Sequence, residues 1–594
     1  ALDTFHDRRN GYFFETNPRG MRHDVLIEGD NFEISWDAIW FVETTIDDEG
    51  WTAEIAIPFS SLSFDPTGDT WGLNVNRGIR RNDEDDRWAD PAPQRFLSDL
   101  GNAGILEGML GANQGLGFRI VPSGTLRRVD DHLLDEGDTD FEPTIDAFYK
   151  VLPSVTAAVT ANTDFGEVEV DERQVNLSRF ALFFPEKRDF FLEDALIFDF
   201  GDISQNGRPF FSRRIGLSAA GKPVPLLVGG KLTGRLGPTK FGVLNTYVDS
   251  HAEVEKQNLL VVRPAANVFG ESTVGAILTN GNPEGGGTST TVGADFLYRN
   301  SNWQGTGNSA QASFWFAKSI NEGVSGDDHG FGAKFVYPND LINWVLGAEE
   351  LQANYDPALG FVNRSDIRHY FGNFRYRTRP SGGPFRTIDH RVFGQVFTDT
   401  GNNLESTNFI FKPLVLATPL GDTLEFAYRT RYEDVEDAFE FLEIPVGTYR
   451  FDEGSVRAYS SRNRPLQADL KVGYGTFFDG RRARVELGVE WRPSYHWLLE
   501  LEYEWNGIQL PRGDSPAHIA RFRVNVQFTP DISWVTFLQY DNQSDRGGIN
   551  SRLHWIIQDG REFFIVINQG LDLSDGVEAT RTEALVKVLF TFTF

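Results

Sequence analysis

The sequence predicts an all-β protein, a large transmembrane antiparallel β-barrel of about 24 strands preceded by an N-terminal β-sandwich domain. Three observations predict this fold. The composition favours strands, with 50 Phe, 16 Tyr, 13 Trp and 59 Gly against 2 Met. Long segments alternate between apolar and polar residues, and the connections between them alternate between short and long.

The alternation is clearest near the C-terminus. In "EALVKVLFTFTF", residues 583–594, Ala584, Val586, Val588 and Phe590 share one face with the phenylalanines that follow. Glu583, Lys587 and two threonines share the other face. Successive side chains of a strand point to opposite faces, so each such segment reads as a strand with one apolar and one ionic side.

A soluble sandwich could show the same alternation. Two features favour the barrel over it. Aromatic residues fall near the ends of the strands, where a membrane interface would hold them, and neighbouring strands carry charges of both signs on their polar faces. We therefore expect these apolar faces to contact outer-membrane lipid.

The connections alternate in length. Short ones carry Pro or Asp, as in "LPS" at 152–154 and "GPT" at 237–239, and the intervening ones are long and acidic, as in "NYDPALGFVNRSD" at 354–366. Bacterial outer-membrane barrels have short periplasmic turns and long outer loops. The pattern predicts a barrel over residues 115–594 in the bacterial outer membrane, with both ends in the periplasm.

Charge and composition exclude several classes of function. The net charge of −29 disfavours nucleic acid and anionic membrane surfaces as partners, and leaves cations, metal ions and neutral sugars open. The absence of cysteine excludes disulfides, thiolate metal sites and cysteine nucleophiles. No apolar run is long enough for a transmembrane helix, and residues 1–20 lack a signal-peptide pattern, so we expect any signal to have been removed.

Residues 1–110 form short strands with aromatic residues between them, which predicts a small periplasmic β-sandwich domain. "LDTFHDRRNGYFFETNPRGMRHD" at 2–24 resembles the second half of a carbohydrate-binding-module-like domain of the family nine type, found in bacterial outer-membrane barrel proteins of unassigned function. "NTDFGEVEVDERQVNLSRFALFFPEKRDFFLEDALIF" at 162–198 resembles the segment that follows in those proteins. The resemblance implies a sugar-binding type of sandwich, here without its first half, that leans on the barrel or on a partner.

Tryptophans of this domain are candidates for carbohydrate binding, because a sugar ring offers an apolar C–H face to an aromatic side chain. Tryptophans within strands more often belong to the core, so both readings stay open. The candidate ligand-binding residues are Trp36, Trp40, Trp71 and Trp88.

A cluster of carboxylates follows the third barrel strand. Oxygen ligands at this spacing suit Ca²⁺, the one cofactor that the sequence suggests. Pairing of these carboxylates with nearby arginines and lysines is the favoured alternative, because no EF-hand loop is present. The candidate metal ligands are Asp164, Glu167, Glu169 and Asp171.

Residues 164–222 are the one long stretch of the barrel region that does not alternate cleanly. A lumen of about 24 strands is too wide for wall side chains to close, so we expect this segment to fold inward as a plug. Its charges can pair with luminal Glu500, Glu502 and Arg521, and its phenylalanines can form a small core. The candidate plug residues are Glu186, Lys187, Arg188, Asp189, Glu193, Arg213 and Arg214.

No catalytic residue is assigned, because no GxSxG, HExxH or phosphate-binding glycine loop is present. The favoured function is binding and passage, or surface handling, of a carbohydrate or similar polar solute. Two alternatives remain. The first is a glycan-processing hydrolase, for which Glu186 and Glu193 could supply a carboxylate pair. The second is a scaffold whose barrel receives an envelope protein partner.

Overall fold

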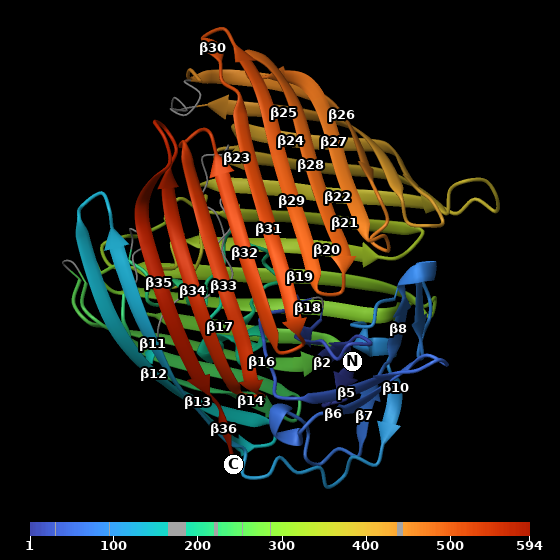
Figure 1. Ribbon diagram of the computed structural model, residues 1–594, viewed down its shortest axis with the longest axis vertical. Coiled ribbons are helices and arrows are strands. Elements are labelled where there is room, and N and C mark those ends of the chain that lie inside the picture. The colour runs from blue at the N-terminus through green and yellow to red at the C-terminus, as the bar shows by residue number, and fades with distance from the viewer. Residues whose placement is uncertain are drawn as a thin grey trace.

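A computed structural model describes residues 1–594 of the chain except 30, 94, 164–185, 219–223, 252–253, 286 and 436–443. It is nearly all β, with a closed barrel of 24 long antiparallel strands and an N-terminal sheet domain (Figure 1). No helix among the described residues is long and apolar enough to cross a membrane. The predicted fold class and strand number are confirmed.

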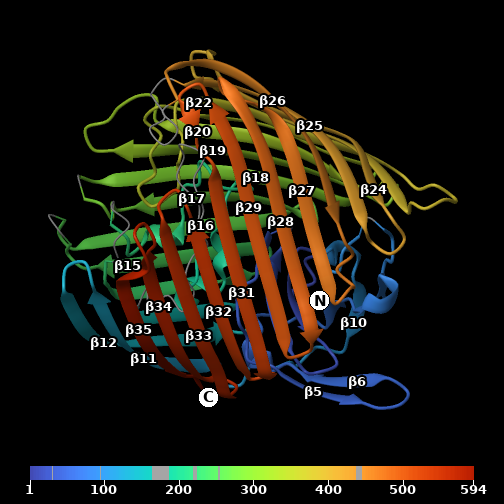
Figure 2. The ribbon, with the colours of Figure 1, turned by 45° about the horizontal axis from the view of Figure 1, so that its top comes forward.

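The N-terminal domain contains one antiparallel sheet of six strands in the order β10-β7-β1-β2-β3-β4 and two hairpins, β5-β6 and β8-β9. Its elements are β1 Leu2–Asp3, β2 Asn10–Thr16, β3 Arg22–Glu28, β4 Asn31–Glu33, β5 Phe41–Ile46, β6 Trp51–Ala56, η1 Phe59–Ser61, β7 Thr70–Leu73, β8 Asn76–Ile79, η2 Arg80–Asn82, β9 Glu84–Arg87, η3 Leu100–Asn102 and β10 Gly104–Glu107. The β5-β6 hairpin projects from the domain (Figure 2). The expected sandwich is therefore represented by one large sheet and two separate hairpins.

The first half of the barrel follows. Its strands are β11 Phe118–Asp131, β12 Glu136–Leu152, β13 Val155–Thr163, β14 Leu226–Leu236, β15 Thr239–Val248, β16 Gln257–Val268, β17 Ser272–Asn280, β18 Ser289–Trp303, β19 Asn308–Asn321, β20 His329–Pro338, β21 Ile342–Leu351 and β22 Ile367–Thr378. Three short helices lie between β13 and β14: α1 Asp189–Leu192, η4 Ala195–Phe198 and η5 Ser212–Arg214.

The second half brings the chain back to β11. Its strands are β23 Thr387–Asp399, β24 Leu404–Ala417, β25 Thr423–Val435, β26 Gly447–Tyr459, β27 Leu466–Phe477, β28 Gly480–Ser494, β29 Trp497–Leu510, β30 Gly513–Asp514, β31 Ala517–Thr529, β32 Ile532–Asp541, β33 Arg546–Gln558, β34 Arg561–Asp572, β35 Glu578–Phe590 and β36 Phe592–Thr593. Each strand pairs with its neighbour in sequence, and β11 closes the ring against β35 and β36.

The outer wall of the barrel is apolar around its circumference, as strand alternation predicts. Large apolar side chains exposed on it include Val228, Phe316, Leu346, Phe409, Leu470, Trp534 and Ile565. Exposed aromatic residues also lie at the strand ends on the side of the C-terminus, among them Trp491, Trp497, Trp555 and Phe592. This surface matches the hydrocarbon layer and one interface of a bilayer. The protein is an outer-membrane barrel with its N-terminal domain on the periplasmic side.

The N-terminal domain lies across the end of the barrel that carries the short turns (Figure 1). Its polar contacts reach turns spread around the ring. They join Phe64 N to Pro153 O at 3.1 Å, Arg9 Nη1 to Asn267 Oδ1 at 2.6 Å, Arg95 Nη1 to Ser309 Oγ at 2.6 Å, Asp83 Oδ2 to Arg386 Nη1 at 2.8 Å and Arg22 Nη2 to Asp531 Oδ1 at 3.6 Å. The domain does lean on the barrel, as its sequence predicts.

Candidate functional site

The described part of the segment between β13 and β14, residues 186–218 and 224–225, lies inside the barrel. Arg188 holds this part together. Its guanidinium donates to Glu186 Oε2 at 2.7 Å, to Ile215 O at 2.8 Å and to Ser212 O at 2.9 Å. Burial raises the pKa of Glu186, but the adjacent Arg188 charge outweighs it and lowers the pKa to about 2. The pair is therefore ionised at neutral pH and closes the segment on itself.

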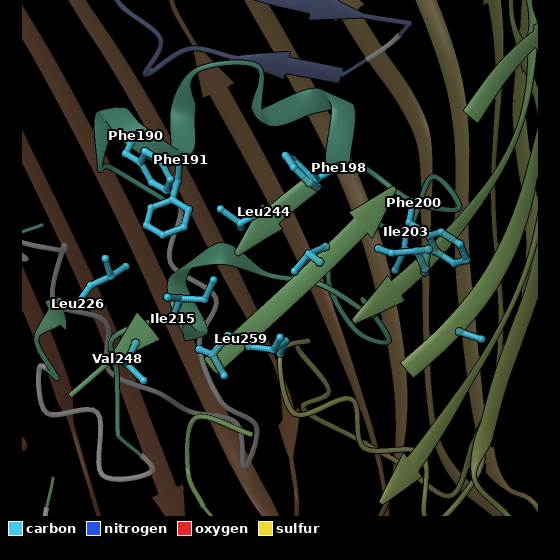
Figure 3. Packing of buried hydrophobic residues seen from close by; sticks show 14 of the residues in the cluster. Phe190, Phe191, Phe198, Phe200, Ile203, Ile215, Leu226, Leu244, Val248 and Leu259 are labelled. Carbon is cyan, nitrogen blue, oxygen red and sulfur yellow. The ribbon is translucent and has the colours of Figure 1, made fainter. Parts of the chain in front are cut away.

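Aromatic and aliphatic side chains of this segment pack against the inner wall. Phe190, Phe191 and Phe198 point toward Leu244 and Leu259 of the wall (Figure 3). The buried cluster also takes in Phe200, Ile203, Ile215, Leu226, Val261, Ile277, Trp315, Leu351 and Tyr355. The phenylalanines thus form a core jointly with β14–β21, and not only among themselves. We call the described residues 186–218 and 224–225 the plug.

Ion pairs and hydrogen bonds fix the plug to the same side of the wall. Lys231 of β14 donates to Phe190 O and Glu193 O, which are backbone acceptors of the plug. Arg119 Nη2 of β11 donates to Glu193 Oε2 at 2.8 Å. Further contacts join Thr233 Oγ1 to Asp194 Oδ2 at 2.6 Å and Lys334 Nζ to Asp202 Oδ2 at 2.5 Å.

The luminal residues that the sequence suggests as partners of the plug also pair on the wall itself. Glu502 of β29 accepts a hydrogen bond from Arg521 of β31 at 3.0 Å, and Glu500 accepts one from Arg523 at 3.4 Å. The reason is register, because β29 places Glu502 directly opposite Arg521 and Glu500 opposite Arg523. Opposite charges on adjacent strands therefore meet across the ladder, and pairing of these residues with the plug stays a prediction.

The outer loop between β21 and β22 forms a second layer over the plug. Phe361 N donates to Arg208 O at 2.9 Å, and Gly207 N donates to Phe361 O at 3.0 Å. Tyr355 Oη, which is buried, donates to Gly207 O at 3.1 Å. The plug is therefore held between the barrel wall and an inward-folded outer loop.

A cavity of about 360 Å³ lies where the N-terminal domain, the plug and the wall meet. The domain contributes residues 35–40, the plug contributes Asp189 and Glu193, and the wall contributes β11, β12 and β33–β35. Its charged lining residues are Arg22, Asp24, Asp37, Arg119, Asp146, Lys187, Asp189, Glu193, Asp559, Glu562 and Lys587, together with His554. No segment alone supplies this set.

Asp24 is buried, whereas Asp37 and Asp189 are exposed toward the cavity that they line. Burial, reinforced by Asp24, Glu562 and Asp189, raises the pKa of Asp37 to about 8. Burial raises the pKa of Asp24 to about 6. Burial also raises the pKa of Asp189, although Lys587 opposes the shift. At neutral pH the cavity therefore holds a neutral carboxylic acid at Asp37, which can donate a hydrogen bond.

Glu193 behaves in the opposite way. Burial alone would raise the pKa of this carboxyl, but Arg119, Lys150 and Lys231 together lower it. The cavity thus has an ionised carboxylate at Glu193 and a protonated carboxyl at Asp37. Such a lining can accept and donate hydrogen bonds at once, which suits a polyhydroxylated ligand.

The four candidate tryptophans lie in different surroundings. Trp36 and Trp40 border the cavity but are only 6% and 1% exposed. Trp71 is 3% exposed and packs between Phe59 and Phe64, whereas Trp88 is 61% exposed. The role of these residues in binding stays a prediction, and the cavity brings together only the first two.

Of the remaining predicted residues, some line the cavity and others do not. Lys187, Asp189 and Glu193 line the cavity, whereas Glu186 and Arg188 are engaged within the plug. Arg213 and Arg214 lie in η5, and Arg214 pairs with Glu284 of an outer loop. The predicted metal ligands Asp164, Glu167, Glu169 and Asp171 lie outside the described residues. Among the residues that are described, no group of three or more His, Asp or Glu side chains could hold a metal ion.

Sequence reasoning missed most of the cavity. Asp37 stands in the "WDAIW" phrase between the two candidate tryptophans, and that position was the available signal. Arg119, Glu562 and Lys587 carry no comparable signal, because each is one polar residue in an alternating strand.

Comparisons with known proteins give no activity. A family model described as "Domain of unknown function (DUF5916)" matches residues 123–233, which run from β11 through the plug to β14. No curated protein gives a significant match.

Among solved structures, the siderophore receptor PiuA from Acinetobacter baumannii is 9% identical, with a TM-score of 0.34 over 80% of this chain and 82% of that one. The siderophore receptor PirA from Pseudomonas aeruginosa is 10% identical, with a TM-score of 0.38 over 80% and 81%. The ferric yersiniabactin uptake receptor FyuA from Yersinia pestis is 8% identical, with a TM-score of 0.31 over 80% and 80%. Similarity of this size carries no conclusion about ligands.

Proposed function

We propose that this outer-membrane barrel binds a carbohydrate or a similar small polar solute in the cavity between its N-terminal domain, plug and wall, and passes it across the membrane. The cavity is the observation that carries the proposal. Its volume of about 360 Å³ falls in the range of about 300–1,000 Å³ that is usual for small-ligand sites.

The chemistry of the lining favours a polyhydroxylated ligand. The side-chain carboxyls of Asp37 and Asp189 have no hydrogen-bond partner among the described residues, and both residues line the cavity. A neutral carboxyl at Asp37 donates to a hydroxyl oxygen, and a carboxylate accepts from a hydroxyl group. The imidazole of His554 stacks on Phe564 with ring centroids 4.3 Å apart. This stacking orients the polar imidazole in the lining of the same cavity. A sugar would satisfy these groups without bringing a net charge into the site.

Binding can be tested with the full chain purified in detergent. Isothermal titration against a panel of neutral mono- and oligosaccharides should find at least one ligand. The double variant Asp37→Asn/Asp189→Asn should raise its Kd by about tenfold or more, because each carboxyl loses part of its hydrogen bonding. Asp48→Asn, at the tip of the β5-β6 hairpin, is the matched control and should leave Kd unchanged. Absence of binding across the panel, or equal affinity of the double variant, would refute the cavity as the site.

A glycan-processing hydrolase is the second candidate. The observation that favours it is the separation of pKa values in one cavity, with a protonated Asp37 and an ionised Glu193. Two carboxyls with opposite protonation states are what general acid–base hydrolysis requires. Incubation with oligosaccharides should then release shorter products, and Glu193→Gln should abolish the release. Binding without any product would leave the transport proposal standing and exclude this one.

A further inference from the structure

A second group of charges lies on the inner wall of the barrel, on strands distant from the plug. It consists of Arg429 and Arg431 on β25, Glu453 on β26, and Arg482 and Arg484 on β28. These positions alternate along their strands with exposed, outward-facing residues such as Tyr428 and Val456, so their side chains point into the lumen. We call this group the arginine wall.

Register brings these residues together. Arg429 lies opposite Glu453, and Arg431 lies opposite Phe451. The strand between Glu453 and the two β28 arginines carries Gly473 and Gly475 at the facing positions. The missing side chains let Arg482 Nη2 reach across β27 to Glu453 Oε2 at 2.7 Å.

Several donors of these arginines have no hydrogen-bond partner among the described residues, as is also true of the buried acceptors Asn408 Oδ1 opposite Arg431 and Asn506 Oδ1 opposite Arg484. Arg482 pairs with Glu453, and Arg484 pairs with Glu486. The Nε atoms of both arginines are buried and have no hydrogen-bond partner among the described residues. Neither Arg429 nor Arg431 donates a hydrogen bond to a described residue. Unpaired guanidinium groups that face one another in a confined space are unfavourable unless an anion joins them.

The charged residues around the arginine wall leave it with a net positive charge among the described residues. Lys471 of β27 adds a cation and contacts Glu486 at 3.3 Å. Among the residues that the structure describes, the carboxylates facing the group are Glu433, Glu453, Glu486 and Glu504, which are four against five cations. Arg457 and Asp469 nearby pair with each other.

Aromatic residues hold the guanidinium groups in place. Arg482 lies over the ring of Phe477 at 4.5 Å, and Arg431 lies over Phe451 at 5.9 Å. These rings belong to a buried cluster with Ile444, Ile508 and Leu510. A stacked guanidinium keeps its N–H fork oriented, which favours two-point contact with an oxyanion.

We propose that the arginine wall binds the oxyanion group of a small solute, either a free phosphate-type anion or the carboxylate of an acidic sugar. Arg429 and Arg431 supply donors that no described residue engages, and Arg482 and Arg484 complete the positive surface. Arginine-lined constrictions select anions in other pores by the same chemistry. This site is independent of the cavity that carries the proposed function, and it gives an acidic protein a local surface of opposite sign.

Titration of the full chain in detergent at low salt tests the site with inorganic phosphate, glucuronate and glucose. Phosphate or glucuronate should bind more tightly than glucose and should weaken as NaCl is added. Arg429→Gln/Arg431→Gln should raise the Kd of the anion by about tenfold or more, because two charge-assisted contacts are lost. Arg429→Lys/Arg431→Lys should lose less affinity for the anion than the glutamine variant, since lysine keeps the positive charge.

Arg521→Gln is the matched control, because Arg521 lies on the same inner wall and is paired with Glu502. It should leave anion binding unchanged. Heat-dependent migration on a denaturing gel confirms that each variant forms the barrel. Binding of phosphate alone identifies a free oxyanion, and binding of glucuronate as well identifies an acidic group on a sugar. Failure of both anions to bind, or an equal loss in Arg521→Gln, would overturn the proposal.

Discussion

Arg263 on β16 and Asp295 on β18 form two parallel hydrogen bonds across the intervening strand, with Nη1–Oδ1 at 2.8 Å and Nη2–Oδ2 at 2.9 Å. The strand between them carries Gly275, where a Cβ would lie 2.1 Å from Arg263 Nη1. Both side chains also hold the plug. Arg263 Nε donates to Asp199 O at 2.9 Å, and Gly201 N donates to Asp295 Oδ2 at 3.0 Å. Glycine at 275 is therefore required for one ion pair to join the wall and the plug.

Asp295→Ala should weaken plug docking strongly. It leaves the buried Arg263 charge without its carboxylate, a change that typically costs about 3–5 kcal/mol. Hydrogen exchange of the Gly201 amide should accelerate. Asp469→Ala is the control, because its pair with Arg457 is exposed and such pairs contribute about 0–1 kcal/mol. Unchanged exchange at Gly201 in the Asp295 variant would show that the pair does not hold the plug.

The docking of the N-terminal domain should depend on pH through Asp37. The folded-state pKa of about 8 lies above the ordinary aspartate pKa of 3.8, so between these values the folded state holds a proton that the unfolded state has lost. The free energy of unfolding or undocking should therefore fall as pH rises from about 4 to about 8. Limited proteolysis of the domain should be faster at pH 9 than at pH 6. Asp37→Asn should reduce this difference, and a difference of equal size in that variant would contradict the assignment.

The tryptophans of the N-terminal domain can be separated by substitution. Trp71→Ala removes a buried ring between Phe59 and Phe64 and should destabilise the domain by about 3–5 kcal/mol. Trp88→Ala changes an exposed side chain and should alter stability by about 0.5 kcal/mol or less. The rate of limited proteolysis of the domain measures the stability change in both variants. Solute titration of the Trp88 variant adds a second readout, because a loss of affinity without a loss of stability would identify Trp88 as a ligand contact.

The barrel could be predicted from sequence because the alternation of apolar and polar residues is visible within each strand. Alternation along 583–594 is visible without knowing what the strand pairs with, and the same holds for the break in alternation that marks the plug. The contacts of the plug are not local. Arg119 meets Glu193 because strand order and register bring β11 beside the plug, and no pattern near either residue predicts that. The cavity shows the same limit, since Asp37 and Lys587 come from opposite ends of the chain.

Removal of the plug should open a path through the barrel. The plug fills one side of the lumen by packing Phe190 and Phe198 on the inner wall, and a barrel of this width has no wall side chains long enough to replace it. Deletion of residues 180–216 should raise the single-channel conductance of the purified protein in planar bilayers.

Two point variants test whether packing of the plug on the wall closes the pore. Phe198→Ala removes a ring buried between plug and wall, at a cost of about 3–5 kcal/mol, and should raise the frequency of open events. Phe331→Ala removes a ring of the same size from the exposed outer face and should leave conductance unchanged. If the deletion and Phe198→Ala both give the trace of the unaltered protein, residues 180–216 do not close the pore. If Phe331→Ala has the same effect as Phe198→Ala, general destabilisation of the barrel explains the change.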